Sequence, residues 1–218
     1  MRFSASKGAR LVARPGALWL ALAAVLIGGS VLAWWLPTER LDWQPALVWR
    51  EPGRWWTAAF VHWSALHLVA NLGAALLVTL FGLVARVPAA IALAWLLAWP
   101  LTHLGLLLQP SLPHYGGMSG VLHAGVAAVI VYLIWCAPGT RRRIALALGA
   151  GLLVKLGVEA PWGPALRQLP GWDIAVAPMA HATGALAGAL CGLVAALLMP
   201  APTPTTAPAA APGPPPPR

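Results

Sequence analysis

Three clusters of polar residues interrupt the long apolar stretches of this 218-residue chain. The first contains Ser119, which follows Gly116 and Gly117, and we expect it at the start of a helix because glycines allow a tight turn. The first N–H groups of a helix lack partners within the helix, and the helix dipole is positive there. Such a position suits a serine nucleophile whose reaction builds up an oxyanion. The same pattern also fits a simple N-cap serine.

The second cluster lies near the start of another apolar stretch and contains His62, His67 and Asn71. His67 and Asn71 are four residues apart and therefore share a helix face, whereas His62 is expected in the turn that enters the helix. These side chains are candidate hydrogen-bond donors to an oxyanion. Each one alone also fits a hydrogen bond between helices or a histidine at the membrane interface.

The third cluster begins at His181. Three glycines spaced four residues apart follow it: Gly184, Gly188 and Gly192. Such stripes let two membrane helices approach closely. Gly120 and Ala124 have the same spacing after Ser119. The simplest packing therefore sets the helix of Ser119 against the helix of His181 and brings these two side chains together.

A serine and a histidine in contact are the minimum for nucleophilic acyl transfer. In this interpretation His181 takes the proton of Ser119 and later returns it to the leaving amine. The oxyanion is held by the Ser119 N–H, His62 and Asn71. No acidic residue falls within the expected spans, so we expect a dyad rather than a triad. The histidines are a poor candidate for zinc, and we expect no metal and no cofactor.

The composition shows what must position these residues. About 60% of the chain is hydrophobic and only 9% is charged, compared with about 25% charged residues in soluble domains. Several apolar stretches are long enough to cross a bilayer, which takes about 20 residues. The sequence therefore predicts an all-α polytopic membrane protein with six spans: residues 17–36, 60–85, 87–108, 119–137, 144–158 and 174–199.

The charges indicate the orientation of these spans. All five acids fall on one side of a six-span arrangement, and most of the basic residues fall on the other: Arg2, Lys7, Arg10, Arg14, Arg86, Arg141, Arg142, Arg143 and Arg218. By the positive-inside rule, both termini are cytoplasmic. The net charge of +9 thus reflects topology, and we expect no nucleic-acid partner.

Three parts follow along the chain: a basic cytoplasmic N-terminus (1–16), a six-helix core (17–199) and a disordered tail rich in Pro and Ala (200–218). The first span also resembles a signal peptide, but its apolar run is longer than a usual signal segment, so we expect an uncleaved helix. The external 37–56 loop is rich in tryptophan, which suits the membrane interface. Lys155 is interpreted as an interface anchor.

These motifs together resemble the rhomboid family of intramembrane serine proteases across residues 17–199. The resemblance rests on His62-x4-His67-x3-Asn71, on Gly117-Met118-Ser119-Gly120 and on His181-x2-Gly184-x3-Gly188, in this order and on one side of the membrane. It implies a rhomboid-like bundle, Ser119 as nucleophile, His181 as general base, and His62 and Asn71 in the oxyanion hole. It implies supporting roles for His67, Gly117, His123, Gly184 and Gly188.

His123 stands where many rhomboids have a tyrosine that packs on the catalytic histidine. Three roles remain open for His123: it acts as a second base, it orients His181, or its ring stacks on His181. We favour the orienting or stacking role. The 117–123 string and Arg54-Trp55-Trp56 resemble the rhombosortase branch, a bacterial branch associated with Gly-Gly-type C-terminal sorting tails. This resemblance implies an endopeptidase of the inner membrane that cleaves membrane-tethered proteins near the periplasmic face.

Two other functions are considered. A non-catalytic rhomboid-like protein that binds membrane clients would lack the serine or the histidine, and this chain keeps Ser119 and His181. A transporter with a histidine proton relay would carry acids within its spans or repeated halves with broken helices, and the sequence shows neither.

Overall fold

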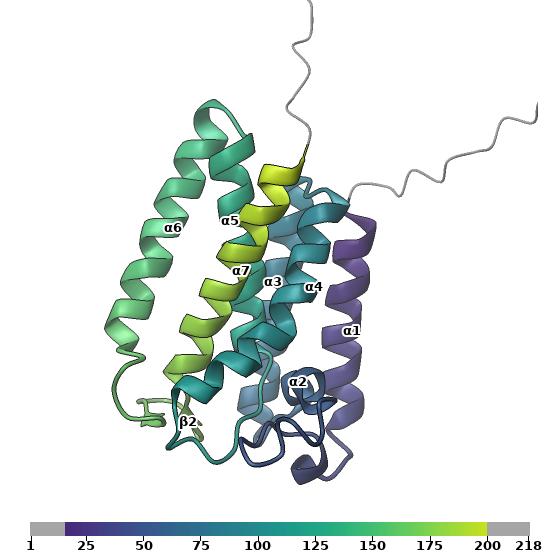
Figure 1. Cartoon of the computed structure of the whole chain (residues 1–218), viewed down its shortest axis with the longest axis vertical. Coiled ribbons are helices and arrows are strands. Elements are labelled where there is room, and N and C mark those ends of the chain that lie inside the picture. Colours follow the sequence, from purple (N-terminus) through teal and green to yellow (C-terminus); the bar gives the residue numbers. More distant parts are fainter. Residues whose placement is uncertain (1–15, 200–218) are drawn as a thin grey trace, which may run out of the picture.

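The computed structural model describes residues 16–199, which are mainly helical (Figure 1). The predicted parts 1–16 and 200–218 lie outside these residues, apart from Gly16. Within the described range, six long helices run roughly along the longest axis: α1 (Ala17–Ala33), α3 (Ala65–Ala85), α4 (Ala89–Leu104), α5 (Ser119–Cys136), α6 (Gly139–Glu159) and α7 (Pro178–Leu198). The connections add short elements: η1 (Thr38–Arg40), α2 (Arg54–Thr57), η2 (Ala58–Phe60), η3 (Gly105–Leu108), and the antiparallel strands β1 (Arg167–Gln168) and β2 (Ala175–Val176).

Four segments of the described chain are long and apolar enough to cross a bilayer: α3, α4 with η3, α5 and α7. The helix α1 is apolar but has only 17 residues. The helix α6 has 21 residues but carries charges near both ends. The protein is therefore a helical membrane protein. All six predicted spans contain a long helix, but length and composition support a membrane crossing for four of them.

Two predicted spans begin four or five residues earlier than the helices that form within them. Ser64 caps α3, and its hydroxyl accepts a hydrogen bond from the His67 N–H at 3.0 Å, so the helix begins at Ala65 rather than at residue 60. In the predicted span 174–199, residues 175–176 form β2, and α7 begins at Pro178. Proline suits the first turn of a helix because the N–H that it lacks has no partner there.

The glycine stripe of α7 packs against α5, as its spacing predicts. A Cβ on Gly184 would overlap the carbonyl oxygen of Gly120, and a Cβ on Gly188 would overlap that of Ala124. A Cβ on Gly192 would lie 2.8 Å from the Cα of Ala128. The two backbones are thus in direct contact along three turns, and this contact sets the relative positions of Ser119 and His181.

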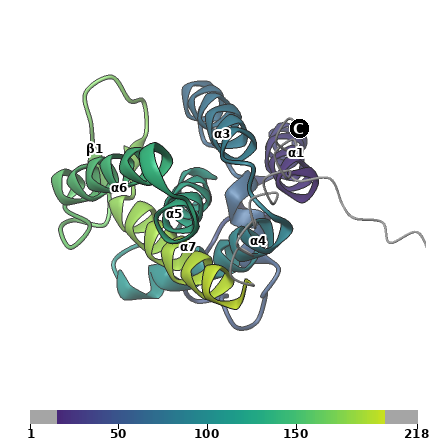
Figure 2. The same cartoon turned by 90° about the horizontal axis from the view of Figure 1, so that it is seen from above.

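The helix α6 lies at the edge of the bundle (Figures 1 and 2). Ala145 is its one buried residue. By contrast, ten residues of α5 and ten of α7 are buried. Apolar burial is the main stabilising contribution to helix packing in a domain core, so α6 is the long helix that the bundle holds least firmly.

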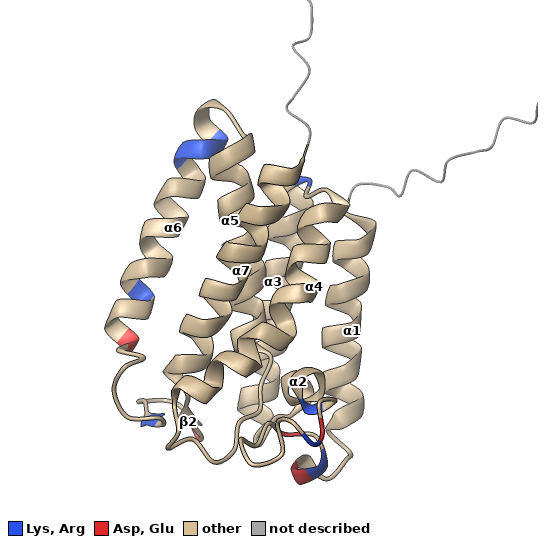
Figure 3. Ribbon diagram, in the orientation of Figure 1, with Lys and Arg blue, Asp and Glu red and all other residues tan. Residues whose placement is uncertain are grey.

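Charged residues gather towards the two ends of the bundle (Figure 3). The end that contains the α1–α3, α4–α5 and α6–α7 connections holds all five acids: Glu39, Asp42, Glu51, Glu159 and Asp173. The opposite end, at the α3–α4 and α5–α6 connections, holds Arg86 and the Arg141–Arg143 run. The segregation that the sequence predicts is therefore present in the fold.

Candidate active site

Ser119 is the first residue of α5 and lies at the acid-rich end of the bundle. The chain enters the helix through Gly117, whose φ of 131° is one that residues with a side chain rarely adopt. The Gly117 N–H donates to the Ala58 carbonyl at 2.9 Å. A Cβ on Gly117 would lie 2.9 Å from Nε2 of His67. Glycine thus lets the turn before Ser119 pass directly beside α3.

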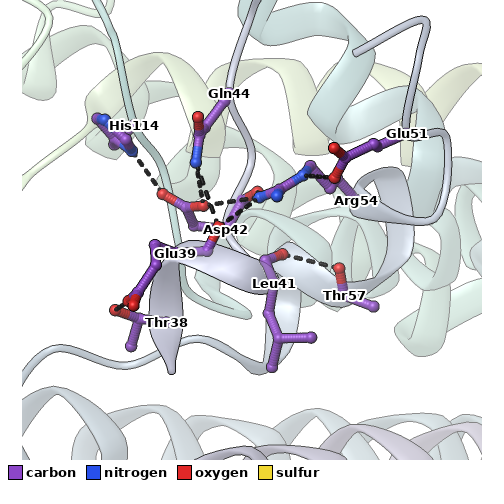
Figure 4. A network of polar contacts seen from close by, with 9 residues as sticks. All are labelled: Thr38, Glu39, Leu41, Asp42, Gln44, Glu51, Arg54, Thr57 and His114. Carbon is purple, nitrogen blue, oxygen red and sulfur yellow. Dashed lines mark hydrogen bonds and ion pairs between the residues drawn. The ribbon is translucent and has the colours of Figure 1, made fainter. Parts of the chain in front are cut away.

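A buried ion pair in the first loop anchors the segment that precedes Ser119 (Figure 4). Arg54 Nη1 lies 2.9 Å from Asp42 Oδ1, and only 7% of Arg54 and 2% of Asp42 are exposed. The second oxygen of Asp42 lies 2.6 Å from Nδ1 of His114, which belongs to the α4–α5 connection. The carboxylate of Asp42 therefore joins the two connections.

Tyr115 extends this attachment to the turn itself. Its backbone exchanges two hydrogen bonds with Trp43, of 2.8 and 2.9 Å. Its hydroxyl donates to the Gly117 carbonyl at 3.0 Å. Burial raises the pKa of Tyr115 to about 12, so the hydroxyl keeps its proton and remains a donor at neutral pH. The first loop, which the sequence indicates only as an interfacial segment, thus fixes the turn before Ser119.

Ser119 and His181 are in contact. The Ser119 hydroxyl oxygen lies 3.0 Å from Nε2 of His181. His181 is 7% exposed and lies on the first turn of α7 beyond Pro178. Ser119 is half-buried. Both residues are placed by the contact of α5 with α7, so the packing expected from the glycines brings the two side chains together.

The other nitrogen of His181 meets an acid, which corrects the expectation of a Ser–His pair without a carboxylate. Glu159 Oε2 lies 2.9 Å from Nδ1 of His181. The predicted fifth span ends at residue 158, but α6 continues to Glu159, its last residue. The acid therefore lies just beyond the span and returns to the site because α6 ends beside α7.

Lys155 is a second residue of α6 at the site, which corrects its interpretation as an interface anchor. Its Nζ lies 2.7 Å from His123 Nε2, 2.9 Å from Glu159 Oε2 and 3.1 Å from His181 Nδ1. Lys155 and Glu159 are four residues apart and form an i, i+4 ion pair. This spacing of opposite charges in an apolar helix is the signal by which the sequence indicates a polar cluster here.

His123 stacks on His181, in agreement with the favoured interpretation. The ring centroids are 4.3 Å apart and the planes are inclined by 18°. His123 Nδ1 lies 2.7 Å from the Ser119 carbonyl oxygen, one turn earlier in α5. The ring is therefore held by its own helix on one nitrogen and by Lys155 on the other, and neither nitrogen contacts the Ser119 hydroxyl.

The two predicted oxyanion donors on the α3 side are placed differently. Asn71 lines the cavity at Ser119 together with His67, whereas His62 does not line it. His62 Nδ1 lies 3.1 Å from the Phe60 carbonyl, and its ring packs on His67 with 4.7 Å between centroids. Burial lowers the pKa of His62 to about 4, so the ring is neutral at pH 7 and Nδ1–H donates to Phe60. The geometry favours His67 over His62 beside an oxyanion.

A cavity of about 310 Å³ opens at Ser119 and His181. The helices supply its polar wall, with His67, Asn71, Lys155 and Glu159. The α6–α7 connection supplies an apolar wall that includes Leu169, Trp172 and Val176. Ser64 at the start of α3 donates to Asp173 at 2.7 Å and so ties this connection to α3. The cavity is a mixed polar and apolar site, as is usual for ligand binding.

A hydroxyl, an imidazole and a carboxylate in hydrogen-bond contact are the groups that nucleophilic acyl transfer uses. The helix start at Ser119 and the amide of Asn71 add donors for an oxyanion. No known family model matches the chain, and no curated protein matches it.

Proposed function

We propose that this protein is an intramembrane serine endopeptidase of the rhomboid type. The observation that carries the proposal is the 3.0 Å contact between the Ser119 hydroxyl and His181 Nε2 at the wall of the cavity. His181 takes the hydroxyl proton while Ser119 attacks the scissile carbonyl, and it returns the proton to the leaving amine. Water then releases the acyl group from Ser119 by the same steps in reverse order.

The oxyanion that forms on the scissile carbonyl is stabilised by the Ser119 N–H at the start of α5. Asn71 contributes its amide, and His67 takes the place that the sequence interpretation gives to His62. These donors belong to two helices, so the oxyanion position depends on how α3 packs beside the turn at Gly117. Preorganised donors of this kind stabilise charge that develops in the transition state.

The substrates that this geometry suits are membrane proteins with a transmembrane segment. A helix hides its carbonyls in hydrogen bonds, so the segment must unwind before Ser119 reaches a peptide bond. Small or helix-breaking residues near the membrane boundary favour that step. The resemblance to rhombosortases adds C-terminal sorting segments of the Gly-Gly type as the specific substrate.

The proposed topology has six crossings in the bacterial inner membrane, with α1 and α6 crossing beside the four longer apolar segments. Arg86 and Arg141–Arg143 then face the cytoplasm with both termini, and the acid-rich end with Ser119 faces the periplasm.

The test is labelling of the detergent-purified full chain with a fluorophosphonate probe, which modifies activated serines. The wild type is expected to be labelled, and Ser119→Ala and His181→Ala are expected to lose the label. Ser111→Ala, which removes an exposed hydroxyl of the α4–α5 connection, is the matched control and keeps it. Label on Ser119→Ala, or no label on a folded wild type with two probe classes, would contradict the proposal and favour a client-binding role.

A further inference from the structure

Nδ1 of His181 has two neighbours with opposite hydrogen-bonding character. Glu159 Oε2, at 2.9 Å, accepts a hydrogen bond, whereas Lys155 Nζ, at 3.1 Å, donates one. A neutral imidazole carries one proton, on either Nδ1 or Nε2. If Glu159 is the partner, Nδ1 holds the proton and Nε2 has a free lone pair. If Lys155 is the partner, Nε2 holds the proton. The two partners therefore select opposite tautomers.

The tautomer decides whether His181 can act as a base. Nε2 is the nitrogen that lies 3.0 Å from the Ser119 hydroxyl. With the proton on Nδ1, Nε2 accepts the Ser119 hydroxyl hydrogen and can remove it. With the proton on Nε2, the ring donates to Ser119 and has no lone pair for the proton. Only the partnership with Glu159 is compatible with proton transfer from Ser119.

His123 draws Lys155 away from His181. The Ser119 carbonyl can only accept, so His123 donates to it from Nδ1 at 2.7 Å. Nε2 of His123 is then a lone pair, and it accepts from Lys155 at 2.7 Å, the shortest contact of that ammonium group. A second N–H of Lys155 donates to Glu159 at 2.9 Å. Both strong contacts of Lys155 are thus made without His181.

We propose that Glu159 is a positioning residue that holds His181 in the tautomer with the proton on Nδ1, in competition with Lys155. The proposal deepens the proposed function and rests on it. During attack, the Ser119 proton moves to His181 Nε2, and the carboxylate of Glu159 stabilises the resulting imidazolium without taking a proton itself. The imidazolium then gives the Nε2 proton to the leaving amine, and the original tautomer returns.

The substitution Glu159→Gln separates this role from simple packing. Lys155 Nζ and His181 Nδ1 both contact the same oxygen, Oε2, and a neutral amide there accepts more weakly than the carboxylate, so Lys155 donates to Nδ1 instead. Nε2 then carries the proton. In serine proteases, an amide in place of the triad carboxylate lowers kcat by about 10⁴-fold through the wrong tautomer. We expect the rate of fluorophosphonate labelling to fall by at least about 10²-fold here.

A second change tests the competition itself. With Lys155→Met added to Glu159→Gln, no ammonium group competes for Nδ1, and the amide oxygen accepts from Nδ1–H. The double variant is therefore expected to be at least about 10-fold faster than Glu159→Gln alone. A residue that only supports the fold would give the opposite result, because losing both side chains would remove more contacts than losing one.

The experiment measures the rate of fluorophosphonate labelling of the full chain in detergent for the wild type, Glu159→Gln, Glu159→Asp, the double variant and Glu39→Gln. Glu39 is an exposed acid at the same end of the molecule and serves as the control for loss of charge, so its variant is expected at the wild-type rate. Glu159→Asp is expected to lie between the wild type and Glu159→Gln.

Histidine ¹⁵N resonances of the same samples report the tautomer of His181 directly. The wild type and the double variant are expected to show the proton on Nδ1, and Glu159→Gln to show it on Nε2. Wild-type labelling of Glu159→Gln, or a double variant no faster than that single variant, would overturn the proposal. A wild type whose labelling does not depend on Ser119 would overturn the proposed function instead, so the two failures are distinguishable.

Discussion

The imidazole rings of His123 and His181 lie face to face, with 4.3 Å between their centroids and 18° between their planes. The stack limits rotation of the His181 ring, since one face is covered from α5. His123→Phe is expected to keep this cover but to release Lys155 towards Nδ1 of His181, and so to lower kcat by about 10-fold, whereas His123→Ala also exposes the ring and lowers kcat further. Cleavage kinetics on a fluorogenic transmembrane substrate give the comparison. Equal, near-complete inactivation of both variants would instead mean that His123 acts as a second base.

The donors on α3 give a second prediction. Asn71→Ala is expected to lower kcat by about 10²- to 10³-fold with KM little changed, because the oxyanion exists only near the transition state. His67→Ala is expected to lower kcat more than His62→Ala, since His67 lines the cavity and His62 does not. Steady-state kinetics of the three variants provide the test.

The reverse order, with His62→Ala the more damaging of the two histidine changes, would restore the role that the sequence interpretation gives to His62. Retained melting temperature in detergent is the control, because His62 and His67 pack on each other and either change can loosen the start of α3.

The contact of α5 with α7 gives a third prediction. Gly184→Ala places a methyl group against the backbone of Gly120, and overpacking of this kind costs about 1–3 kcal/mol. Gly151→Ala on α6 is the matched control, because nothing lies within 4 Å of its Cβ position, and alanine stabilises a helix interior by about 0.5–1 kcal/mol relative to glycine. Unfolding in mixed SDS micelles measures both. Equal stability of the two variants would show that the close approach contributes nothing.

The buried ion pair of the first loop gives a fourth prediction. Asp42→Ala removes the buried carboxylate beside Arg54 and leaves the guanidinium only the half-exposed carboxylate of Glu51, so it is expected to cost up to about 3 kcal/mol of unfolding free energy. Glu51→Gln removes the second carboxylate beside Arg54. The Glu51 side chain is 50% exposed, so this change is expected to lower the unfolding free energy by about 1 kcal/mol or less. Because Asp42 also contacts His114 near the active-site turn, we expect Asp42→Ala to slow labelling of Ser119, and normal labelling would contradict this coupling.

His62 gives a prediction about pH. Burial lowers its pKa from 6.5 to about 4 in the folded protein, so between these values the unfolded chain binds more protons than the folded one. The unfolding free energy therefore falls as the pH falls from 6.5 towards 4, by about 1 kcal/mol for each pH unit from this group. His62→Gln removes this contribution, and its stability is expected to depend less on pH over that range. Parallel slopes for the variant and the wild type, measured by unfolding at pH 7, 6 and 5, would contradict the assignment.

The sequence predicts the parts of the site that depend on spacing along one helix. Small residues every fourth position on two helices indicate their close packing, and that packing brings Ser119 to His181. A stretch of about 20 apolar residues likewise indicates a helix without reference to its neighbours. These inferences succeed because the information lies within one turn or a few turns of the chain.

The parts that the sequence did not predict depend on how separate elements meet. Glu159 is separated from His181 by a connection that contains β1 and β2, and no spacing rule states where that connection ends. The choice between His62 and His67 depends on tertiary structure, because His62 lies in the turn before α3, as expected, but packs on His67 and does not line the cavity.

The position of α6 has a consequence for how the site becomes competent. Ala145 is the one buried residue of α6. The helix nevertheless carries Glu159, whose carboxylate contacts His181. A shift of α6 along its axis by one turn, about 5.4 Å, would withdraw Glu159 while leaving Ser119 and His181 on helices whose backbones touch. Assembly of the bundle, which depends on the contact of α5 with α7, and the contact of Glu159 with His181, which depends on α6, are thus separable properties of this chain.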